Sequence, residues 1–540
     1  MSLTAYDFDR HTIQDPIHGA VTFGHVEKAL IDHRLFQRLH GLRQNSLLHL
    51  VFPAANHTRF DHSIGVMKMA GTFFDGVLKN QERICEAGVK RQTWQGSYRV
   101  DDAEIGETIR ALSKDPYYKV VLRIAALFHD IGHGPLSHLF DKFFPSIEKM
   151  IKLLGEKDYE HIKTRLASMG SEKMSEPVRH EILSCVIATR ILRDCAEEFE
   201  RYGLDIAGVV RDVCAIIDDE IQPSKQFRIF PYKVQGLFHD ILSSDIDIDR
   251  MDYLLRDSHM CGVNYGVYDP DRILKSMCAY GKVDRKELRI GVRYSGIGAL
   301  EDLLLARYQM HAQIYGHKTN RACNAMLECI RERLISCGWT WYGGCSSVGD
   351  LLNIFVDLDD RAFVNKLMDP EVDGRAGKVK ELAEKLFLER RLVKRVFEEK
   401  ADCSKGNSAR AKEVRRRFEE HKTRLKKAGI WAAEDQFENK GPKVNSDGYP
   451  LKMLRKHPVD GFYMVHEVKD FSTVIQFLPE LECTFRIYCK DASVKKAKNL
   501  LPALQGADKV RQKRARRTQK PKSVLSRRKS ARAEKGSRNH

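Results

Sequence analysis

Apolar residues recur at spacings of three and four along most of residues 25–335, and short turn-rich loops interrupt them. This is the period of an amphipathic helix, so the pattern predicts a large helical domain. Residues 284–294, DRKELRIGVRY, alternate well enough to predict a short β-hairpin within it. No internal repeat is visible along the chain.

The pattern changes after residue 335. Residues 381–428 combine dense charge with helical spacing, and we expect helices over RLVKRVFEEK (391–400) and AKEVRRRFEEHKTRLKK (411–427). Three later runs are rich in β-branched and aromatic residues and predict strands: Phe462–Val468, Thr473–Phe477 and Cys483–Tyr488. The predicted fold class is therefore mainly α. Its parts are a helical core (1–335), a charged helical connection (336–450), a small α/β lobe (451–508) and a tail (509–540).

Charge is concentrated in that tail. Residues 509–540 hold fourteen Lys and Arg against one acid, Glu534, so they carry +13 of the net +17 of the 540-residue chain. With few apolar residues, the tail is predicted to be disordered. Its lysine and arginine clusters favour a nuclear-import signal or nucleic-acid contact, and the alternative is a solvated, solubilising end. The protein is accordingly expected in the nucleus or the cytoplasm.

Other features of the composition exclude several classes of protein. No uncharged apolar run approaches the roughly 18 residues of a membrane helix, so no membrane partner is expected. The start, MSLTAYDFDR, lacks the apolar core of a secretion signal. The thirteen cysteines include no C-x-x-C pair, which favours a reduced intracellular protein without a zinc ribbon or a disulfide framework.

Four places in the helical region gather histidine and aspartate. They are NHTRFDHSIGV (His57, Arg59, Asp61, His62), ALFHDIGHGPLSH (His129, Asp130, His133, His138), RHEIL (His180) and SSDIDIDRMDYLLRD (Asp245, Asp247, Asp249, Asp252, Asp257). Buried charge is costly unless it is paired or coordinates a metal. A divalent cation with mixed ligands takes two or three histidines and one or two aspartates. His62, His129, Asp130 and Asp249 would meet this need if the fold joins three separated helices.

Each motif alone has an ordinary explanation. On a helical wheel, the apolar residues of the last segment form one stripe, while Asp249, Tyr253, Arg256 and Asp257 fall on the opposite side. For this helix alone, the pattern favours a solvated charged face. A single histidine, or a single His-Asp pair, is also common by chance. The combination of all four segments is what indicates a metal site.

The histidine and aspartate pattern H…HD…D resembles that of the HD-domain metal phosphohydrolases. Within them, the chain is similar to the SAM- and HD-domain deoxynucleoside triphosphate (dNTP) triphosphohydrolases. The matching segments are QDPIHG (14–19), LFQRLHGLRQ (35–44), VFPAANHTRFDHSIGV (51–66), HDIGHGPLSHLFD (129–141), DIDRMDYLLRD (247–257), RYQMHAQIYGHK (307–318) and FRIYCKDASVKKA (485–497). The similarity covers roughly residues 10–335 and 455–500, and no segment resembles a SAM domain.

This resemblance implies a role for each matching residue. His62, His129, Asp130 and Asp249 would be the metal ligands, and Asp130 and His133 would take part in catalysis with His180 as general acid. The resemblance assigns phosphate contacts to Arg59, His133, His138, Arg250 and Lys318. It assigns sugar and base contacts to Gln44, Asn45, Tyr253, Asp257, Arg307 and Tyr315, Arg307 reaching either the phosphates or the base.

The implied reaction is hydrolysis of a dNTP to deoxynucleoside and inorganic triphosphate, which would control dNTP levels. A bound divalent metal (Mn, Mg, Fe or Zn) would polarise the α-phosphoryl group and activate water. Arginine suits the phosphate oxygens, and a histidine can protonate the leaving alkoxide. The resemblance also implies a homo-oligomer, dimeric or tetrameric, and a nucleotide activator.

Two positions depart from the family's pattern. Asn45 stands where the family carries leucine against the sugar, and a polar residue there would admit a 2′-hydroxyl. His40 stands where the family has an arginine that helps bind an activating guanine nucleotide, although Asp32 and Gln37 are kept. Two alternative functions remain open: an HD hydrolase of another phosphate ester, such as a nucleoside monophosphate or an oligonucleotide, and a nucleic-acid-binding protein with a vestigial HD site.

Overall fold

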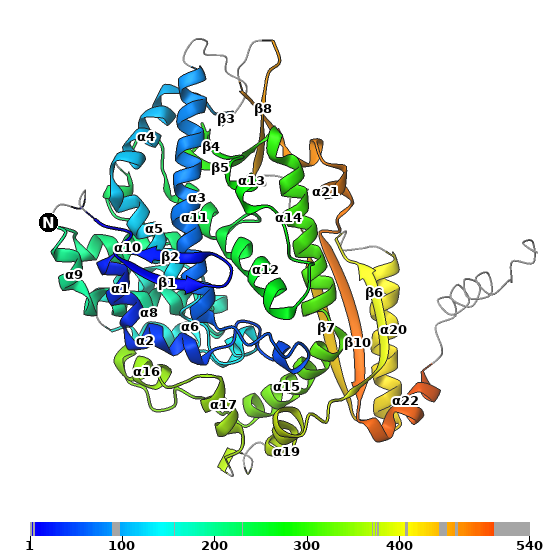
Figure 1. Ribbon diagram of the computed structural model, residues 1–540. Helices are drawn as coiled ribbons and strands as arrows, with labels where there is room; N and C mark the ends of the chain where they lie inside the picture. The colour runs from blue at the N-terminus through cyan, green and yellow to red at the C-terminus, as the bar shows by residue number, and fades with distance from the viewer. Residues whose placement is uncertain are drawn as a thin grey trace, which may run out of the picture.

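A computed structural model describes residues 3, 6–88, 98–155, 157–228, 230–369, 371–372, 374, 377–404, 409–441, 451–459 and 463–501. The fold is mainly α, as the sequence predicts (Figure 1). Within the described residues, no helix combines the length and the apolar character needed to cross a bilayer. The thirteen cysteines are all described, and all are free thiols.

Long helices build the body of the molecule, which holds the largest apolar core. These helices are α3 (Arg59–Gly88), α4 (Ala103–Lys114), α5 (Pro116–Phe128), α8 (His180–Asp194), α10 (Ile206–Ile217), α11 (Gln235–Leu242), α12 (Ile248–Cys261), α14 (Ile297–Met310) and α15 (Lys318–Ser336). Shorter helices surround them: α1 (His25–Asp32), α2 (Arg34–Gln37), α6 (Ile147–Leu153), α7 (Glu160–Ala167), α9 (Ala196–Glu200), α13 (Pro270–Leu274), α16 (Val348–Phe355), α17 (Asp360–Leu367) and α19 (Val379–Ala383). Helices α3, α5 and α12 pack together at the centre, because α3 contacts both of the others.

Three small sheets complete the fold. The N-terminal hairpin pairs β1 (His11–Asp15) with β2 (Gly19–Phe23). A five-stranded sheet has the order β3-β4-β5-β8-β9, and its strands are β3 (Tyr98–Arg99), β4 (Met277–Lys282), β5 (Glu287–Arg293), β8 (Lys452–Lys456) and β9 (Tyr463–Glu467). Strands β4 and β5 form an antiparallel hairpin, which confirms the hairpin predicted near residues 284–294.

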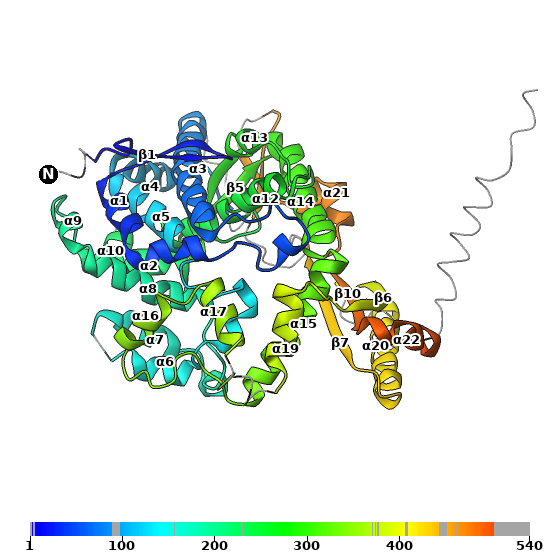
Figure 2. The same cartoon turned by 60° about the horizontal axis from the view of Figure 1, so that its bottom comes forward.

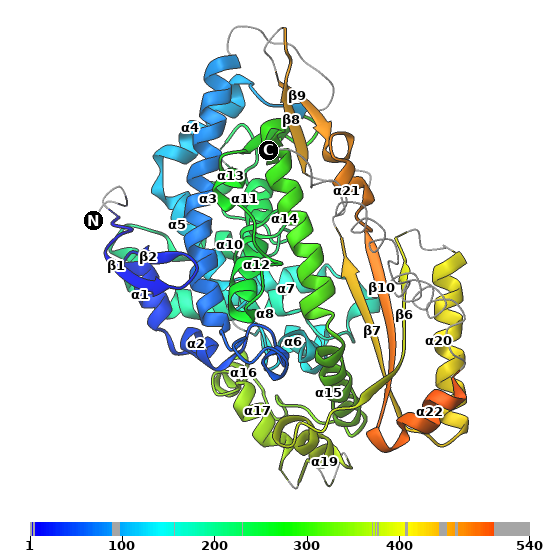
Figure 3. The ribbon, with the colours of Figure 1, turned by 45° about the vertical axis from the view of Figure 1, so that its right-hand side comes forward.

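The third sheet belongs to a lobe beside the body (Figure 2). Its antiparallel order is β6-β10-β7, with β6 (Lys394–Asp402), β7 (Ala432–Lys440) and β10 (Leu481–Cys489). Helix α20 (Ala409–Lys427) and helix α22 (Val494–Leu500) lie on one side of this sheet, and α15 contacts β7 from the body (Figure 3). Phe418 of α20 and Phe485 of β10 lie in a small apolar core of the lobe.

Two predicted elements of the C-terminal half are wrong, and the others are confirmed. The segment 391–400, predicted as helix, contains most of strand β6, whereas 411–427 is helical as predicted. Thr473–Phe477, predicted as a strand, is helix α21, because Ser472 caps it by accepting a hydrogen bond from the Ile475 N–H at 3.0 Å. The strands predicted at Phe462–Val468 and Cys483–Tyr488 correspond to β9 and β10. The domain boundaries remain a prediction, and the basic tail lies outside the described residues.

Candidate metal centre and adjoining cavity

Three helices place the predicted metal ligands next to one another. Helix α3 begins at Arg59, so His62 lies in its first turn, and His129 directly follows the buried helix α5. Helix α12 starts after Asp247, whose side chain accepts a hydrogen bond from the Arg250 N–H at 2.7 Å, so Asp249 also lies in a first turn. The ends of three packed helices therefore meet at one point.

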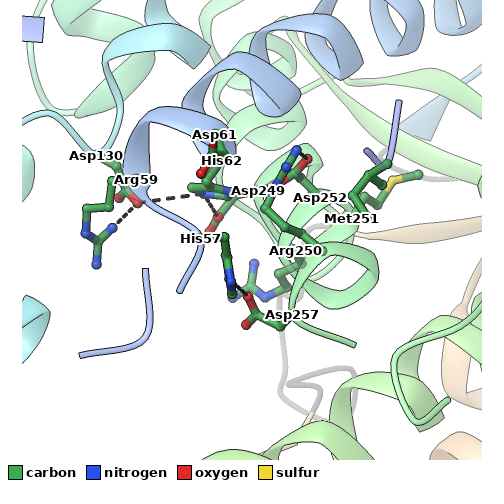
Figure 4. A network of polar contacts seen from close by, with 12 residues as sticks. His57, Arg59, Asp61, His62, Asp130, Asp249, Arg250, Met251, Asp252 and Asp257 are labelled. Atoms are coloured by element: carbon green, nitrogen blue, oxygen red, sulfur yellow. Dashed lines mark hydrogen bonds and ion pairs between the residues drawn. The ribbon is translucent and has the colours of Figure 1, made fainter. Parts of the chain in front are cut away.

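The four predicted ligands converge there. His62 Nε2 lies 3.1 Å from Asp249 Oδ1 and 3.7 Å from Asp130 Oδ2. His129 Nε2 lies 3.6 Å from Asp130 Oδ1 and 3.7 Å from Asp249 Oδ1. Figure 4 shows His62 between the two carboxylates, with Arg59 paired to Asp130. The sequence-predicted set is thus a single cluster.

The two imidazoles are oriented as metal ligands would be. His62 Nδ1 lies 2.7 Å from Asp252 Oδ2, and His129 Nδ1 lies 2.8 Å from the Ala126 carbonyl oxygen. Each ring can donate its Nδ1 proton to these acceptors, which leaves a lone pair on Nε2. Both Nε2 atoms are buried without a hydrogen-bond partner. The donor set of two imidazoles and two carboxylates fits a divalent cation.

The charge around His62 also favours a cation. Burial lowers the pKa of His62, but the adjacent carboxylates of Asp249 and Asp252 outweigh it and raise the pKa to about 10. The opposite effect acts on Asp249. Burial raises its pKa, but the adjacent imidazoles of His129 and His62 outweigh it, so this pKa falls well below its ordinary value. The site therefore stabilises positive charge, which a proton or a metal ion can supply.

A cavity of about 480 Å³ opens beside the cluster. Most of the predicted substrate residues line it: Gln44, Asn45, Arg59, Asp130, His133, His138, His180, Asp249, Tyr253, Asp257 and Tyr315. Its volume lies within the range of small-molecule sites, and its wall mixes apolar, aromatic and charged side chains.

A second cluster of histidines lies on the cavity wall. The rings of His133 and His180 stack at 3.8 Å between centroids with 19° between their planes. Asp141 Oδ2 lies 3.3 Å from His138 Nδ1 and 3.6 Å from His180 Nδ1. Together with Asp141, these three histidines form a group that could also hold a cation.

Protonation differs between the two stacked rings. Burial and the Arg59 charge hold the pKa of His133 well below its ordinary value. Burial also lowers the pKa of His180, but the nearby Asp141 carboxylate and the charges of Glu181 and Asp130 outweigh it, so this pKa is raised. His133 is therefore neutral near pH 7, while His180 retains a proton more readily.

The predicted sugar contacts are tied together by hydrogen bonds. His57 Nε2 lies 2.6 Å from Asp257 Oδ1 and 3.4 Å from Asn45 Nδ2. Tyr315 Oη donates to Asp257 Oδ2 at 2.5 Å, and its ring meets that of Tyr253 edge to face at 6.4 Å. Asp257 and His57 are both buried, so this part of the wall is fixed before any ligand binds.

A strained turn shapes the wall between the metal cluster and these residues. Leu136 and Ser137 have φ values of 58° and 60°, which non-glycine residues rarely adopt. The Leu136 N–H donates to Asp360 Oδ1 at 2.8 Å, and Arg59 Nη2 donates to Ser137 Oγ at 3.0 Å. The contact with Asp360 stabilises the turn, and Ser137 of the turn positions the Arg59 guanidinium.

Three predicted substrate residues lie differently. Lys318 lines a neighbouring cavity of about 460 Å³, together with Arg390, Lys394 and Arg395. Arg250 pairs with Asp247, and Arg307 Nη1 lies 3.1 Å from Asp245 Oδ1. These three cations are absent from the described lining of the main cavity, so their phosphate or base contacts remain predictions.

Several residues of the site carry no recognisable sequence motif. Arg321 and Asn324 of α15, together with Phe437 and Glu438 of β7, line the cavity from the side of the lobe. No motif marks them, and only the pairing of β7 with β10 brings that wall into place. Asp141 could have been predicted from the sequence, because it ends the matching segment HDIGHGPLSHLFD. The charged face of α12 is also not solvated as its pattern favours, since Arg256 and Asp257 are buried.

Comparison with known proteins bears on this geometry. Residues 269–434 match the family model described as the HD associated region. The human deoxynucleoside triphosphate triphosphohydrolase SAMHD1 is 28% identical over 58% of this chain and 43% of its own length. The chain resembles the HD-domain phosphohydrolases. An uncharacterised Bacillus subtilis protein, YwfO, is 30% identical over 60% of this chain and 56% of its own length.

A solved structure supports the fold. The crystal structure of a hypothetical protein from Aquifex aeolicus superimposes with a TM-score of 0.58 at 23% identity, covering 91% of this chain and 100% of that one. The chain spans about half the length of the curated relatives it matches. These similarities support the fold and the candidate metal-binding site, and the reaction and its substrate are a separate question.

Proposed function

We propose that this protein hydrolyses deoxynucleoside triphosphates to deoxynucleosides and inorganic triphosphate. The observation that carries the proposal is the pair of buried, unpartnered Nε2 atoms of His62 and His129, which face two carboxylates at the edge of the cavity. When bound there, a divalent cation would polarise the α-phosphoryl group and lower the pKa of water. The similarity to human SAMHD1 supports the choice of substrate.

The remaining steps, phosphate binding and proton donation, would fall to side chains around the cavity. Arg59, anchored to Asp130 and Ser137, presents its guanidinium to the phosphates, and the neutral His133 and the exposed His138 offer N–H donors to phosphate oxygens. His180, whose raised pKa keeps it protonated, would donate a proton to the leaving 5′-oxygen. Asp141 would hold His180 in position through its contact with Nδ1.

The nucleoside would occupy the rest of the cavity. Gln44 and Asn45 would meet the sugar hydroxyls, while Tyr253, Asp257 and Tyr315 would enclose the sugar. The base would extend toward Phe437 of the lobe, whose flat ring offers a surface for stacking.

One observation favours a second candidate, the hydrolysis of a less highly charged phosphate ester. A triphosphate carries about four negative charges and calls for several cations. Of the predicted phosphate cations, Arg250 is paired with Asp247, and Lys318 lines the neighbouring cavity. A nucleoside monophosphate needs less positive charge than the triphosphate.

A single assay separates the two candidates. Purified protein with Mn²⁺ or Mg²⁺ is incubated with each dNTP, each ribonucleoside triphosphate (NTP) and each monophosphate, and the products are resolved. Inorganic triphosphate together with nucleoside would support the first reaction. Phosphate released from monophosphates alone would refute it and support the second. Oligomeric state, an activating nucleotide and the nuclear or cytoplasmic location remain proposals.

A further inference from the structure

The turn between β1 and β2 contains a motif that the proposed reaction does not use. Its sequence is DPIHG, residues 15–19. Asp15 Oδ1 accepts hydrogen bonds from the N–H groups of Ile17 and His18, each at 2.8 Å. Gly19 follows with φ of +66°, a conformation that glycine adopts without strain. The motif is therefore a rigid turn that fixes the direction of His18.

His18 reaches from this turn to a buried carboxylate in α12. Its Nε2 lies 2.6 Å from Asp252 Oδ1, and the other oxygen of the same carboxylate lies 2.7 Å from Nδ1 of the metal-ligand candidate His62. Arg256 completes the set, donating from Nε and Nη2 to Asp252 at 2.8 and 2.9 Å. The Asp252 carboxylate thus accepts four hydrogen bonds, which accounts for both of its oxygens.

Charge fixes the roles of donor and acceptor in this network. Asp252 is fully buried, and Arg256, which can only donate hydrogen bonds, donates to both of its oxygens, so the carboxylate is ionised. An ionised carboxylate only accepts hydrogen bonds, so His18 and His62 must both donate. His62 therefore carries its proton on Nδ1, and its Nε2 lone pair faces the metal cluster.

The surrounding chain leaves little room for Asp252 to move. A Cβ atom at Gly65, one turn after His62, would lie 2.1 Å from Asp252 Oδ1 and 2.3 Å from Arg256 Nη2. The third nitrogen of the Arg256 guanidinium, Nη1, donates to Asp15 Oδ2 at 2.8 Å. The turn thus holds the network at two points, through His18 and through Asp15.

We propose that His18 is a positioning residue of the metal centre. By holding Asp252 Oδ1, it keeps Oδ2 on the Nδ1 proton of His62 and so fixes the tautomer and the ring orientation of that ligand. Without His18, Oδ1 loses one of its two donors, and on that side the carboxylate is held against His62 by Arg256 alone. This inference rests on the metal centre of the proposed function, and it extends that centre to the N-terminal hairpin.

The test measures metal affinity rather than catalysis. The full chain is stripped of metal with a chelator and titrated with Mn²⁺ by calorimetry, and the unfolding temperature of the metal-free protein is recorded alongside. His18→Ala should raise the Kd for Mn²⁺ by about 10–100-fold, the usual effect of losing a group that orients a metal ligand. His18→Gln keeps an N–H donor in reach of the same oxygen and should recover most of the affinity.

A matched control comes from the same hairpin. His11 on β1 contacts His25, 3.3 Å away, and forms no hydrogen bond with Asp252 among the described residues, so His11→Ala should bind Mn²⁺ like the wild type. A His18→Ala protein with wild-type Kd would overturn the proposal. The proposal would also be overturned if His11→Ala weakened Mn²⁺ binding equally, if His18→Gln failed to recover the affinity, or if the wild type bound no Mn²⁺. A wild type that binds Mn²⁺ yet hydrolyses no dNTP would instead refute the proposed reaction and leave the positioning role standing.

Discussion

The two histidine clusters of the cavity use the same residue types for different chemistry. In the metal cluster, His62 and His129 are tied down at Nδ1, and their unpartnered Nε2 atoms converge on Asp130 and Asp249. In the second cluster, His133 and His180 stack face to face, and the nearby carboxylate, Asp141, meets nitrogen atoms at the ring edges. The neighbours of each ring therefore distinguish the clusters: a hydrogen-bonded Nδ1 leaves Nε2 free for a metal, whereas the raised pKa of His180 suits it to donating a proton.

The largest effect should come from removing the metal cluster. His129→Ala combined with Asp130→Ala removes two of four ligands, so we expect hydrolysis and Mn²⁺ binding both to be abolished. The helical circular-dichroism signal should persist, because both residues follow the end of α5 and support none of its turns. His259→Ala, on the exposed side of α12, is the control and should behave like the wild type. Full activity of the double variant would rule out a metal mechanism.

A single change in the second cluster should lower turnover while the metal cluster still binds Mn²⁺. His180→Ala should lower turnover by roughly 10²–10⁴-fold, the usual contribution of a general acid. Mn²⁺ titration should give the wild-type Kd, since His180 contacts no proposed ligand nitrogen. If the variant loses Mn²⁺, the two clusters are one metal site, and the distinction between them fails.

A smaller effect should appear in the pH profile. Burial lowers the pKa of His180, but the Asp141 carboxylate, 3.6 Å away, is the largest of the contributions that together raise it. Asp141→Asn removes that charge, so this pKa falls and the protonated fraction at neutral pH decreases. The alkaline limb of the kcat profile should therefore move to lower pH. At a fixed pH above both pKa values, kcat should fall about tenfold for each pH unit by which the pKa of His180 is lowered. An unmoved limb would mean that His180 is not the acid.

The smallest effect should lie at the sugar. Asn45 Nδ2 faces His57 Nε2 at 3.4 Å, and leucine there would offer no polar group to a 2′-hydroxyl. Asn45→Leu should therefore sharpen the preference for dNTP over NTP, by roughly tenfold in the ratio of kcat/KM. The measurement is that ratio for the same base in the two variants. An unchanged ratio would shift the discrimination to Tyr253 and Tyr315.

The metal cluster could be predicted because each of its segments carries its own motif. The burial of the charged face of α12 could not be predicted in this way. A helical wheel separates two faces but gives no information on what covers the second. Here Arg256 of that face pairs with Asp15 of the hairpin turn, and Asp257 pairs with His57. The lobe's wall of the cavity was missed for a related reason: Phe437 and Glu438 reach it only through strand pairing far along the chain.

Strand β6 shows how charge hides a strand pattern. Its buried positions alternate, at Phe397, Glu399 and Ala401, as expected for a strand with one covered face. The middle one is an acid paired with Arg417 of α20, so the sequence reads as charged helix rather than as alternating apolar residues. For Thr473–Phe477, the β-branched residues favour a strand, and the cap at Ser472 overrides them.

The strand order β6-β10-β7 has a consequence for how the chain folds. The central strand of the lobe is the last of the three to be synthesised, and it pairs across more than forty residues with one neighbour and about eighty with the other. Until residue 489 leaves the ribosome, β6 and β7 have no partner between them, and their edges are exposed to other chains. A nascent or prematurely terminated chain ending before β10 would therefore be prone to aggregation, even with all four metal ligands already made.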